Sequence, residues 1–285
     1  MSKLSLIIAT LERADELHRL LSSLVLQTDK NFEVVIVDQS KGDSLVPMIS
    51  EYSNLGLYIQ HHKINQQNLS HARNYGARMA KGDILAFPDD DCWYEPDLIM
   101  EVRKAFFSKP QLDGIVAYWV EYQEKEKSFV DKRLSLDAWR KFHGGNASSI
   151  TLFLKRRMLD SIGWFDERLG VGGWFGAAEE TDLIMRALSA GAEIERCPTA
   201  RVHHIYATTL SGNLIELCRK ARMRAHGTGA VYAKHSLSFF VVLRGSIAPI
   251  ILPIIRLAGF RALLCGVCIT IGRIEGFFKW GWGKS

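Results

Sequence analysis

The segment Gly82-Asp83-Ile84-Leu85-Ala86-Phe87-Pro88-Asp89-Asp90-Asp91-Cys92 joins an apolar run to three consecutive carboxylates. Residues 84–87 are typical of a buried strand. Three acids at its carboxyl end would repel one another unless a cation lay among them. Open α/β sheets bind ligands at the carboxyl ends of their strands, and a divalent cation holding a phosphate-bearing substrate would explain the cluster. The alternative is an acidic turn in which Asp89 or Asp90 caps the next helix.

Alternation of strands and helices in the first 110 residues predicts the fold class. Strands are expected at residues 4–8, 32–37, 57–59 and 84–87, with amphipathic helices around 17–25, 72–80 and 98–106. This order predicts an α/β fold, with a Rossmann-like, mostly parallel sheet flanked by helices on both faces. Further strands are expected at 115–120, 149–154, 193–195 and 201–205. A loop is expected at 121–133, a glycine-rich loop at 170–176 and a helix at 183–188.

Composition indicates a globular protein with ordinary thiols. The 285 residues are 47% hydrophobic and 24% charged, with a net charge of +5, which is usual for a soluble domain. The five cysteines are scattered, so reduced thiols in a cytosolic setting are expected. Cys265-x-x-Cys268 lies in an apolar stretch and is interpreted as core packing.

The C-terminal region, residues 213–285, combines basic and apolar residues. Its only acids are Glu216 and Glu275, and arginines separate apolar runs at 237–243, 247–255 and 262–272. None of the runs reaches the ~20 residues of a spanning helix. The pattern predicts helices lying on an anionic membrane surface, peripheral or monotopic. A helical cap with solvated arginines is the alternative. Nucleic-acid binding is not expected, because the region is too apolar for a phosphate-binding surface.

Motifs along residues 3–210 resemble those of the family 2 glycosyltransferases, which have the glycosyltransferase A fold and include bacterial enzymes of surface-polysaccharide synthesis. Ala9, Leu11, Glu12 and Glu180 depart from the usual pattern. The motifs are Ser5-Leu6-Ile7-Ile8-Ala9-Thr10-Leu11-Glu12-Arg13, Val35-Ile36-Val37-Asp38, Ala72-Arg73-Asn74-Tyr75-Gly76, Asp89-x-Asp91, Gly163-Trp164-Phe165-Asp166-Glu167 and Glu179-Glu180-Thr181-Asp182-Leu183.

The resemblance implies an enzyme and a division of the chain. Residues 1–110 would bind a nucleotide-sugar, residues 111–212 would bind the acceptor, and residues 213–285 would hold the protein at the cytoplasmic face of the membrane. The implied reaction is an inverting, metal-dependent transfer from a nucleotide-sugar, most simply a UDP-sugar, to a lipid-linked or polysaccharide acceptor. Mn²⁺ or Mg²⁺ is the implied cofactor, and a homo-oligomer is left open.

Donor-side residues follow from the resemblance and from the chemistry of a diphosphate leaving group. A divalent cation neutralises that group as it departs. The predicted metal ligands are Asp91, Asp89 and His204. Asp38 would accept the N–H of the base with Thr10 in support, and Arg73 would meet the phosphates from a helix N-terminus. The full predicted nucleotide-sugar set is Thr10, Arg13, Asp38, Arg73, Asp89 and Asp90. The alternatives are a turn role for Asp38, a surface position for Arg73 and a structural role for His204.

Acceptor-side residues come from the later motifs. Glu180 is the predicted general base for the acceptor hydroxyl. Glu179 is expected to cap the following helix or bind the acceptor, and Asp182 to be a first-turn helix acid or an acceptor contact. Trp174 and Phe175 would stack on a sugar or anchor their loop in the core.

Two other functions remain open at this level. A polyprenyl-phosphate sugar synthase would share the nucleotide half, but its acceptor is already ionised and needs no base at Glu180. A catalytically inactive binding or scaffolding module would explain the motif departures at Leu11, Glu12 and Glu180.

Overall fold

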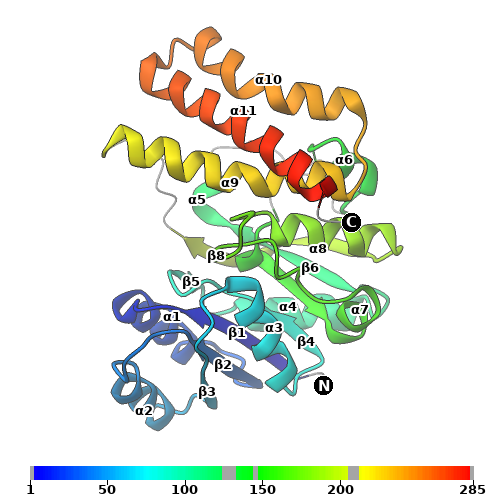
Figure 1. The fold of residues 1–285 in the computed structure, drawn as a ribbon. Coiled ribbons are helices and arrows are strands. Elements are labelled where there is room, and N and C mark those ends of the chain that lie inside the picture. The colour runs from blue at the N-terminus through cyan, green and yellow to red at the C-terminus, as the bar shows by residue number, and fades with distance from the viewer. Residues whose placement is uncertain (1–2, 124–132, 144–146, 205–211, 283–285) are drawn as a thin grey trace.

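The computed structural model describes residues 3–123, 133–143, 147–204 and 212–282. Its centre is one eight-stranded sheet in the order β3-β2-β1-β4-β7-β6-β8-β5. Helices cover both faces, and three further helices follow at the C-terminus (Figure 1). The strands are β1 Leu4–Thr10, β2 Phe32–Asp38, β3 Ile59–Lys63, β4 Ile84–Ala86, β5 Cys92–Tyr94, β6 Gly114–Trp119, β7 Leu152–Lys155 and β8 Ile194–His204. The helices are α1 Ala14–Val25, α2 Val46–Asn54, α3 Leu69–Met79, α4 Leu98–Ser108, α5 Val120–Gln123, α6 Leu136–Arg140, α7 Arg156–Ile162, α8 Glu179–Ser189, α9 Leu214–Lys234, α10 Phe239–Ile255 and α11 Gly259–Trp282, with a 3₁₀ turn at Ser149–Thr151.

The parallel half of the sheet matches the prediction, except that β3 begins at Ile59, where the strand expected at 57–59 was to end. β1 pairs in parallel with β2 and β4, and β2 with β3. Every residue of β1 and β2 is buried, as expected of strands covered on both faces. Side chains alternate between the faces, so Leu6 and Ile8 join the core under α1 and α4, while Ile7 and Ala9 join the core under α3 and α8.

The second half of the sheet differs from the prediction. β7 is antiparallel to β4 and β6, and β5, which was not predicted, is antiparallel to β8. The two short strands expected at 193–195 and 201–205 are one strand, β8, whose pairing with β6 shifts register between Ala117 and Tyr118. The strand expected from residue 149 begins as a 3₁₀ turn. Helices α2, α5, α6 and α7 were not predicted. α5 occupies the start of the loop expected at 121–133, and most of the rest of that loop lies outside the described residues.

The strand order brings distant polar residues to one edge of the sheet. Thr10 and Asp38 are partners at the ends of β1 and β2. An isolated bridge pairs Ala9 with Asp89, just after β4. The carboxyl ends of β1, β2 and β4 therefore meet beside the acidic segment, as the parallel arrangement requires.

The C-terminal region forms three helices, with α9 packed on α8 and α11 packed on α9 (Figure 1). Glycines make the α9–α11 contact close. A Cβ atom added at Gly229 of α9 would lie 2.0 Å from the carbonyl oxygen of Arg273, and one at Gly276 of α11 would lie 2.1 Å from that of His226. Cys218 of α9 and Cys265 of α11 meet in the same contact, with their sulfur atoms 3.9 Å apart. Within the described ranges, no helix combines the length and apolar character needed to cross a bilayer.

This close contact predicts different effects of the same substitution at two positions of α11. We expect Gly276→Ala to lower the free energy of unfolding by about 1–3 kcal/mol, because the methyl group overlaps the backbone of α9. Gly281→Ala has no neighbouring atom within 4 Å and should be neutral or stabilising by up to ~1 kcal/mol through helix propensity. Urea denaturation of both variants measures the difference. Equal stabilities would contradict the packing described.

Candidate active site

Asp90, the middle acid of the triplet, points inward toward β1. It is buried, accepts a hydrogen bond from Thr10 Oγ1 at 2.8 Å, and accepts another from Arg13 Nη1 at 2.8 Å. Burial, with the neighbouring Asp91 and Asp89 carboxylates, raises the pKa of Asp90 to about 6 despite these bonds. Thr10 therefore supports Asp90 rather than Asp38, which corrects the predicted pairing.

Asp91 faces an arginine and a histidine. Its carboxylate lies 3.0 Å from Arg13 Nη1 and 3.0 Å from His204 Nε2. Pairing of Cys92 with His204 between β5 and β8 produces this contact. Burial acts to raise the pKa of Asp91, but His204 and Arg13 outweigh it and lower the pKa. The hydrogen bond to Asp91 raises the pKa of His204. Glu121, which the sequence analysis did not single out, accepts the backbone N–H of His204 at 3.1 Å.

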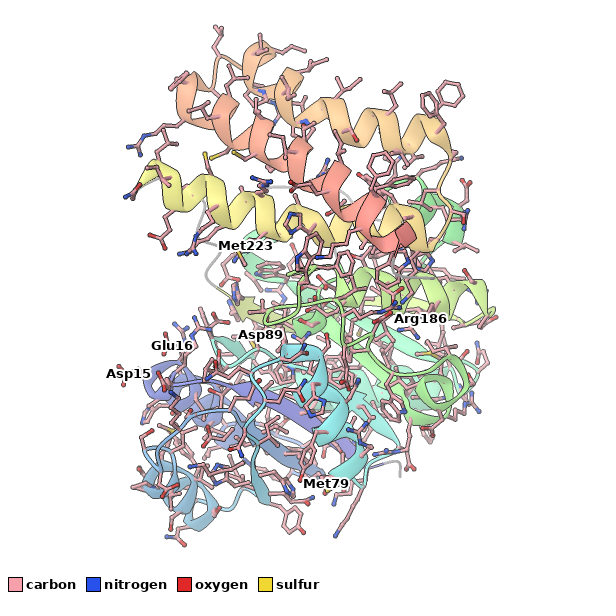
Figure 2. The ribbon with its side chains drawn as sticks, viewed as in Figure 1. Asp15, Glu16, Met79, Asp89, Arg186 and Met223 are labelled. Carbon is pink, nitrogen blue, oxygen red and sulfur yellow. The ribbon has the colours of Figure 1, made fainter. Side chains whose placement is uncertain are left out.

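Asp89 is joined to the start of α8 through a buried arginine. Arg73 Nη2 donates to Asp89 Oδ1 at 2.6 Å and to Ser149 Oγ at 2.9 Å, while Arg73 Nη1 donates to Glu179 Oε1 at 2.9 Å. Burial, together with Asp91 and Glu179, raises the pKa of Asp89 although Arg73 opposes the shift. In Figure 2 Asp89 lies at the edge of the sheet that faces the C-terminal helices.

Contrary to the prediction from the sequence, Arg73 does not lie at the N-terminus of its helix. α3 begins at Leu69, and the Asn68 side chain caps it by accepting the N–H of His71. Arg73 lies in the second turn. Its guanidinium, rather than the positive end of the helix, brings positive charge to the carboxylates.

Asp38 lies at the end of β2 and is fully buried. It accepts the N–H of Ser40 at 2.8 Å, and His61 Nε2 of β3 lies 3.2 Å from its other oxygen. His61 was not predicted. Two histidines within a short strand were the available signal, but without the β2–β3 register their partner could not be assigned.

Glu179 and Glu180 begin α8, after Ala178 in a left-handed conformation. Glu179 is the first residue of the helix and pairs with Arg73, so the predicted capping role is wrong. Burial and the adjacent Glu179 carboxylate raise the pKa of Glu180 to about 8. A carboxyl with this pKa is suited to accept a proton near neutral pH.

Asp182 is turned away from this cluster. Its side chain is fully buried and lies 2.8 Å from His235 Nε2, 2.8 Å from Lys234 Nζ and 2.9 Å from Arg186 Nε. These partners fix α9 on α8. Asp182 is therefore a first-turn acid of α8, which is one of its predicted roles, and its contacts are structural. They do not support the predicted catalytic or acceptor-binding role.

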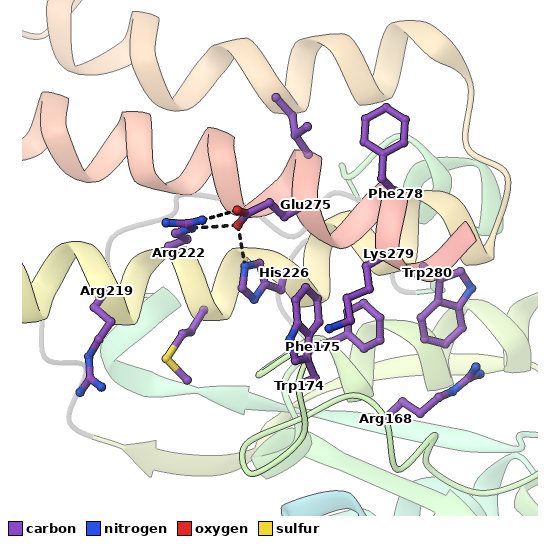
Figure 3. Close-up of a pocket in the computed structure, with 12 residues that line it drawn as sticks. Arg168, Trp174, Phe175, Arg219, Arg222, His226, Glu275, Phe278, Lys279 and Trp280 are labelled. Atoms are coloured by element: carbon purple, nitrogen blue, oxygen red, sulfur yellow. Dashed lines mark hydrogen bonds and ion pairs between the residues drawn. The ribbon is translucent and has the colours of Figure 1, made fainter. Parts of the chain in front are cut away.

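Trp174 and Phe175 lie in the glycine-rich loop, against α9 and α11 (Figure 3). Trp174 stacks on His226 with ring centroids 4.4 Å apart, and Phe175 is buried with its ring 5.1 Å from that of Trp280. Anchoring in the core therefore describes Phe175, whereas Trp174 remains exposed at a groove.

The acidic cluster offers part of a ligand set for a divalent cation. No group of three or more His, Cys, Asp or Glu side chains gathers as a metal cage anywhere in the described ranges. Mg²⁺ and similar cations commonly use one or two carboxylates and complete their shell with substrate phosphates and water. Asp89 and Asp91, with His204 beside them, offer that partial set. Five carboxyl groups gather at this edge, and burial with mutual repulsion raises the pKa of three of them, Asp89, Asp90 and Glu180. The other two are Asp91 and Glu179. The donor set fits a cation that arrives with a diphosphate.

Comparison with known proteins identifies the family. The profile of Glycosyl transferase family 2 matches residues 5–163. The uncharacterized glycosyltransferase YwdF of Bacillus subtilis is 33% identical over 244 residues, covering 82% of this chain and 87% of that protein. The chain therefore belongs to glycosyl transferase family 2.

Other relatives match over shorter lengths. An uncharacterized glycosyltransferase of Haemophilus influenzae is 34% identical over 39% of this chain, and this chain spans 37% of its length. This chain is 28% identical to the glycosyltransferase GlyA of Streptococcus pneumoniae over 45% of its own length, and it spans 18% of the length of GlyA.

Solved structures confirm the fold predicted from the resemblance. The mannosyltransferase PcManGT from Pyrobaculum calidifontis, in complex with GDP-Man and Mn²⁺, has a TM-score of 0.65 at 14% identity, covering 100% of this chain and 88% of that chain. S. aureus TarS 1–349 has a TM-score of 0.60 at 16% identity, and the match covers 98% of this chain and 92% of that chain. The fold is thus the glycosyltransferase A fold.

The environment of Asp182 predicts how stability depends on pH. Burial acts to raise its pKa, but His235, Arg186 and Lys234 hold the pKa below the ordinary 3.8. Because the folded-state pKa is depressed, the stabilisation is present above pH ~4 and is lost as pH falls through the folded-state value.

We expect Asp182→Asn to lower the free energy of unfolding at pH 7 by about 3–5 kcal/mol, the usual effect of breaking a buried ion pair. The difference from wild type should shrink below pH 4. Urea titrations between neutral and acid pH measure it, with Asp137→Asn in an exposed pair as the matched control. A difference that stays constant down to acid pH would contradict this assignment.

Proposed function

We propose that the protein transfers a sugar, with inversion, from a nucleotide-sugar to a lipid-linked or polysaccharide acceptor in cell-surface polysaccharide synthesis, with the help of a divalent cation. The observation that carries the proposal is the acidic cluster at the ends of β1, β2 and β4, with Glu180 beside it. A relative from Escherichia coli, 31% identical over 38% of this chain, is named UDP-Glc:alpha-D-GlcNAc-diphosphoundecaprenol beta-1,3-glucosyltransferase WfaP. TarS is also known with UDP-GlcNAc. These names favour a UDP-sugar donor.

On the donor side, the residues of the cluster hold the nucleotide and the cation. Asp38 accepts an N–H of the base at the buried end of β2. Asp89 and Asp91 would hold the cation, with His204 able to join them only after losing its proton, and the cation would supply positive charge to the leaving diphosphate. Arg73 fixes the carboxylates of Asp89 and Glu179 relative to each other, and Arg13 neutralises part of the charge on Asp90 and Asp91.

On the acceptor side, Glu180 accepts the proton of the attacking hydroxyl. A base whose pKa lies near the working pH combines a useful deprotonated fraction with a strong drive to take the proton. Direct attack opposite the leaving diphosphate then forms the new glycosidic bond with inverted configuration.

The predicted metal and donor sites can be tested by nucleotide binding. We expect UDP with Mn²⁺ to stabilise the wild type by about 2.7 kcal/mol at a hundredfold excess over its dissociation constant, and the gain to fall sharply in Asp91→Asn. Thermal shift with and without Mn²⁺ measures this, and Asp43→Asn at an exposed position is the control. Equal shifts with and without metal would contradict cation-assisted binding, and no shift with any nucleoside diphosphate would contradict the donor.

The role of Glu180 predicts the pH dependence of transfer. The base works when deprotonated, so kcat/KM should rise with pH and level off above the pKa of Glu180, which is about 8. A cation near Asp89 would favour the carboxylate and shift this rising limb to lower pH. Glu180→Gln should lose about 10²–10⁴-fold in rate and lose this limb. Undiminished transfer by Glu180→Gln would instead support a polyprenyl-phosphate sugar synthase, whose acceptor is already ionised.

We also propose that α10 rests on the cytoplasmic face of an anionic membrane. α10 has no buried residue, and large apolar side chains are exposed on it and just after it. They include Phe240 of α10, Leu257 between α10 and α11, and Phe260 at the start of α11. Arg244 and Arg256 belong to the same segment. Exposed apolar surface flanked by cations is the composition of interfacial helices.

Vesicle binding tests this surface. We expect sedimentation with phosphatidylglycerol vesicles, weaker binding to phosphatidylcholine and loss at high salt. Phe240→Asp with Leu257→Asp should weaken binding at least about tenfold, because each apolar side chain contributes about 1.5–3 kcal/mol when buried. Phe107→Asp, exposed on α4, is the matched control. Equal vesicle binding by the wild type, the double variant and Phe107→Asp would contradict the proposal that α10 contacts the membrane.

A further inference from the structure

A groove with a volume of ≈ 1160 Å³ lies apart from the acidic cluster, between the glycine-rich loop, α9 and α11 (Figure 3). Volumes of this order accommodate ligands larger than a monosaccharide. The groove is unused by the mechanism above.

The floor of the groove is apolar and open to solvent. Four large apolar side chains gather there with exposed fractions of 44% for Trp174, 47% for Met223, 45% for Ile274 and 55% for Phe278. Single exposed apolar residues are ordinary, but a cluster inside a concave surface indicates a binding site for an apolar ligand.

The rim of the groove is cationic. Glu275 is the only acid among its lining residues, and it is already paired with Arg222 and His226. Arg219 and Lys279 form no ion pair with a carboxylate of the described residues, and Lys279 Nζ lies 3.6 Å from the centre of the Trp174 ring. Figure 3 shows Arg219 projecting from α9 away from α11. An apolar floor with unneutralised cations complements an amphiphile with an anionic head.

The groove shares a wall with the candidate active site. On one side of the loop, Ser70 Oγ donates to the carbonyl of Leu169, and a Cβ added at Gly170 would lie 3.3 Å from Glu179 Oε2. On the other side, one added at Gly176 would lie 2.8 Å from the carbonyl of Met223. A molecule in the groove is therefore separated from the Glu179–Arg73 pair by a single stretch of loop.

We propose that this groove binds the phosphate-bearing end of a long-chain lipid that carries the acceptor sugar. The chain lies on Met223, Ile274 and Phe278, and the phosphates meet Arg219 and Lys279. This inference rests on the proposed function and narrows its acceptor to a lipid-linked sugar rather than a free polysaccharide.

Farnesyl diphosphate is a suitable probe, titrated by calorimetry with EDTA present so that no metal-held diphosphate at Asp89 and Asp91 contributes. We expect it to bind at least about tenfold more tightly than inorganic pyrophosphate, since a tenfold ratio is only ~1.4 kcal/mol and the chain buries more apolar surface than that requires. Phe278→Asp and Arg219→Glu, both at exposed positions, should each weaken binding at least about tenfold.

Two matched variants serve as controls. Phe107→Asp on α4 and Phe240→Asp on α10 make the same kind of change at exposed sites outside the groove and should leave binding unchanged. Pyrophosphate binding as tightly as farnesyl diphosphate would overturn the inference, and so would equal weakening by Phe240→Asp, which indicates adsorption to α10. Wild type that shows the metal-dependent UDP shift but no farnesyl diphosphate binding overturns this inference alone. Absence of both overturns the proposed function as well.

Discussion

The buried guanidinium of Arg73 pairs with two carboxylates from distant parts of the chain. Asp89 lies 16 residues from Arg73 in the sequence and Glu179 lies 106 residues from it. Removing a cation from water costs several kcal/mol, so it is tolerated only because two carboxylates and the Ser149 hydroxyl complete its hydrogen bonds. Each partner in turn depends on Arg73, since its loss would leave two carboxylates buried together. The end of the β4 segment, α3 and the start of α8 are thereby held in one arrangement, and the candidate donor and acceptor residues with them.

The sequence predicts those parts of this arrangement that depend on local pattern. Apolar runs such as residues 4–8 and 32–37 indicate buried parallel strands, and the acids after residue 87 then follow from the strand direction. β5 is only three residues long and has no periodicity to detect, yet its pairing with β8 sets His204 against Asp91. Long-range antiparallel pairing of this kind depends on register, which a single sequence does not encode locally. The same limit explains Asp182, since a motif match locates it in a helix but does not say which partners it faces.

The basic residues of the C-terminal region serve two purposes, which composition does not separate. Their excess predicts contact with lipid headgroups, but some of them form ion pairs inside the protein. Lys234 binds Asp166 and Asp182, and Arg222 binds Glu275. Composition gives the number of cations but not their partners. The helices thus have two kinds of surface. α9 joins α8 and α11 through ion pairs, while α10 keeps its apolar side chains exposed.

The acidic turn considered at the outset fails on a structural detail. Were the triplet merely a helix cap, Asp89 or Asp90 would precede a helix and accept its first N–H groups. α4 instead begins after Asp97 and α8 after Ala178, and the triplet runs into strand β5. Asp90 is buried with a raised pKa, and Asp89 shares its arginine with Glu179. Such crowding of carboxylates is unfavourable for the fold alone, and proteins retain unfavourable local arrangements chiefly where function requires them. The triplet forms a turn that leads into β5 and does not cap a helix. Under the proposed function, a cation-bearing substrate at this edge would relieve the repulsion.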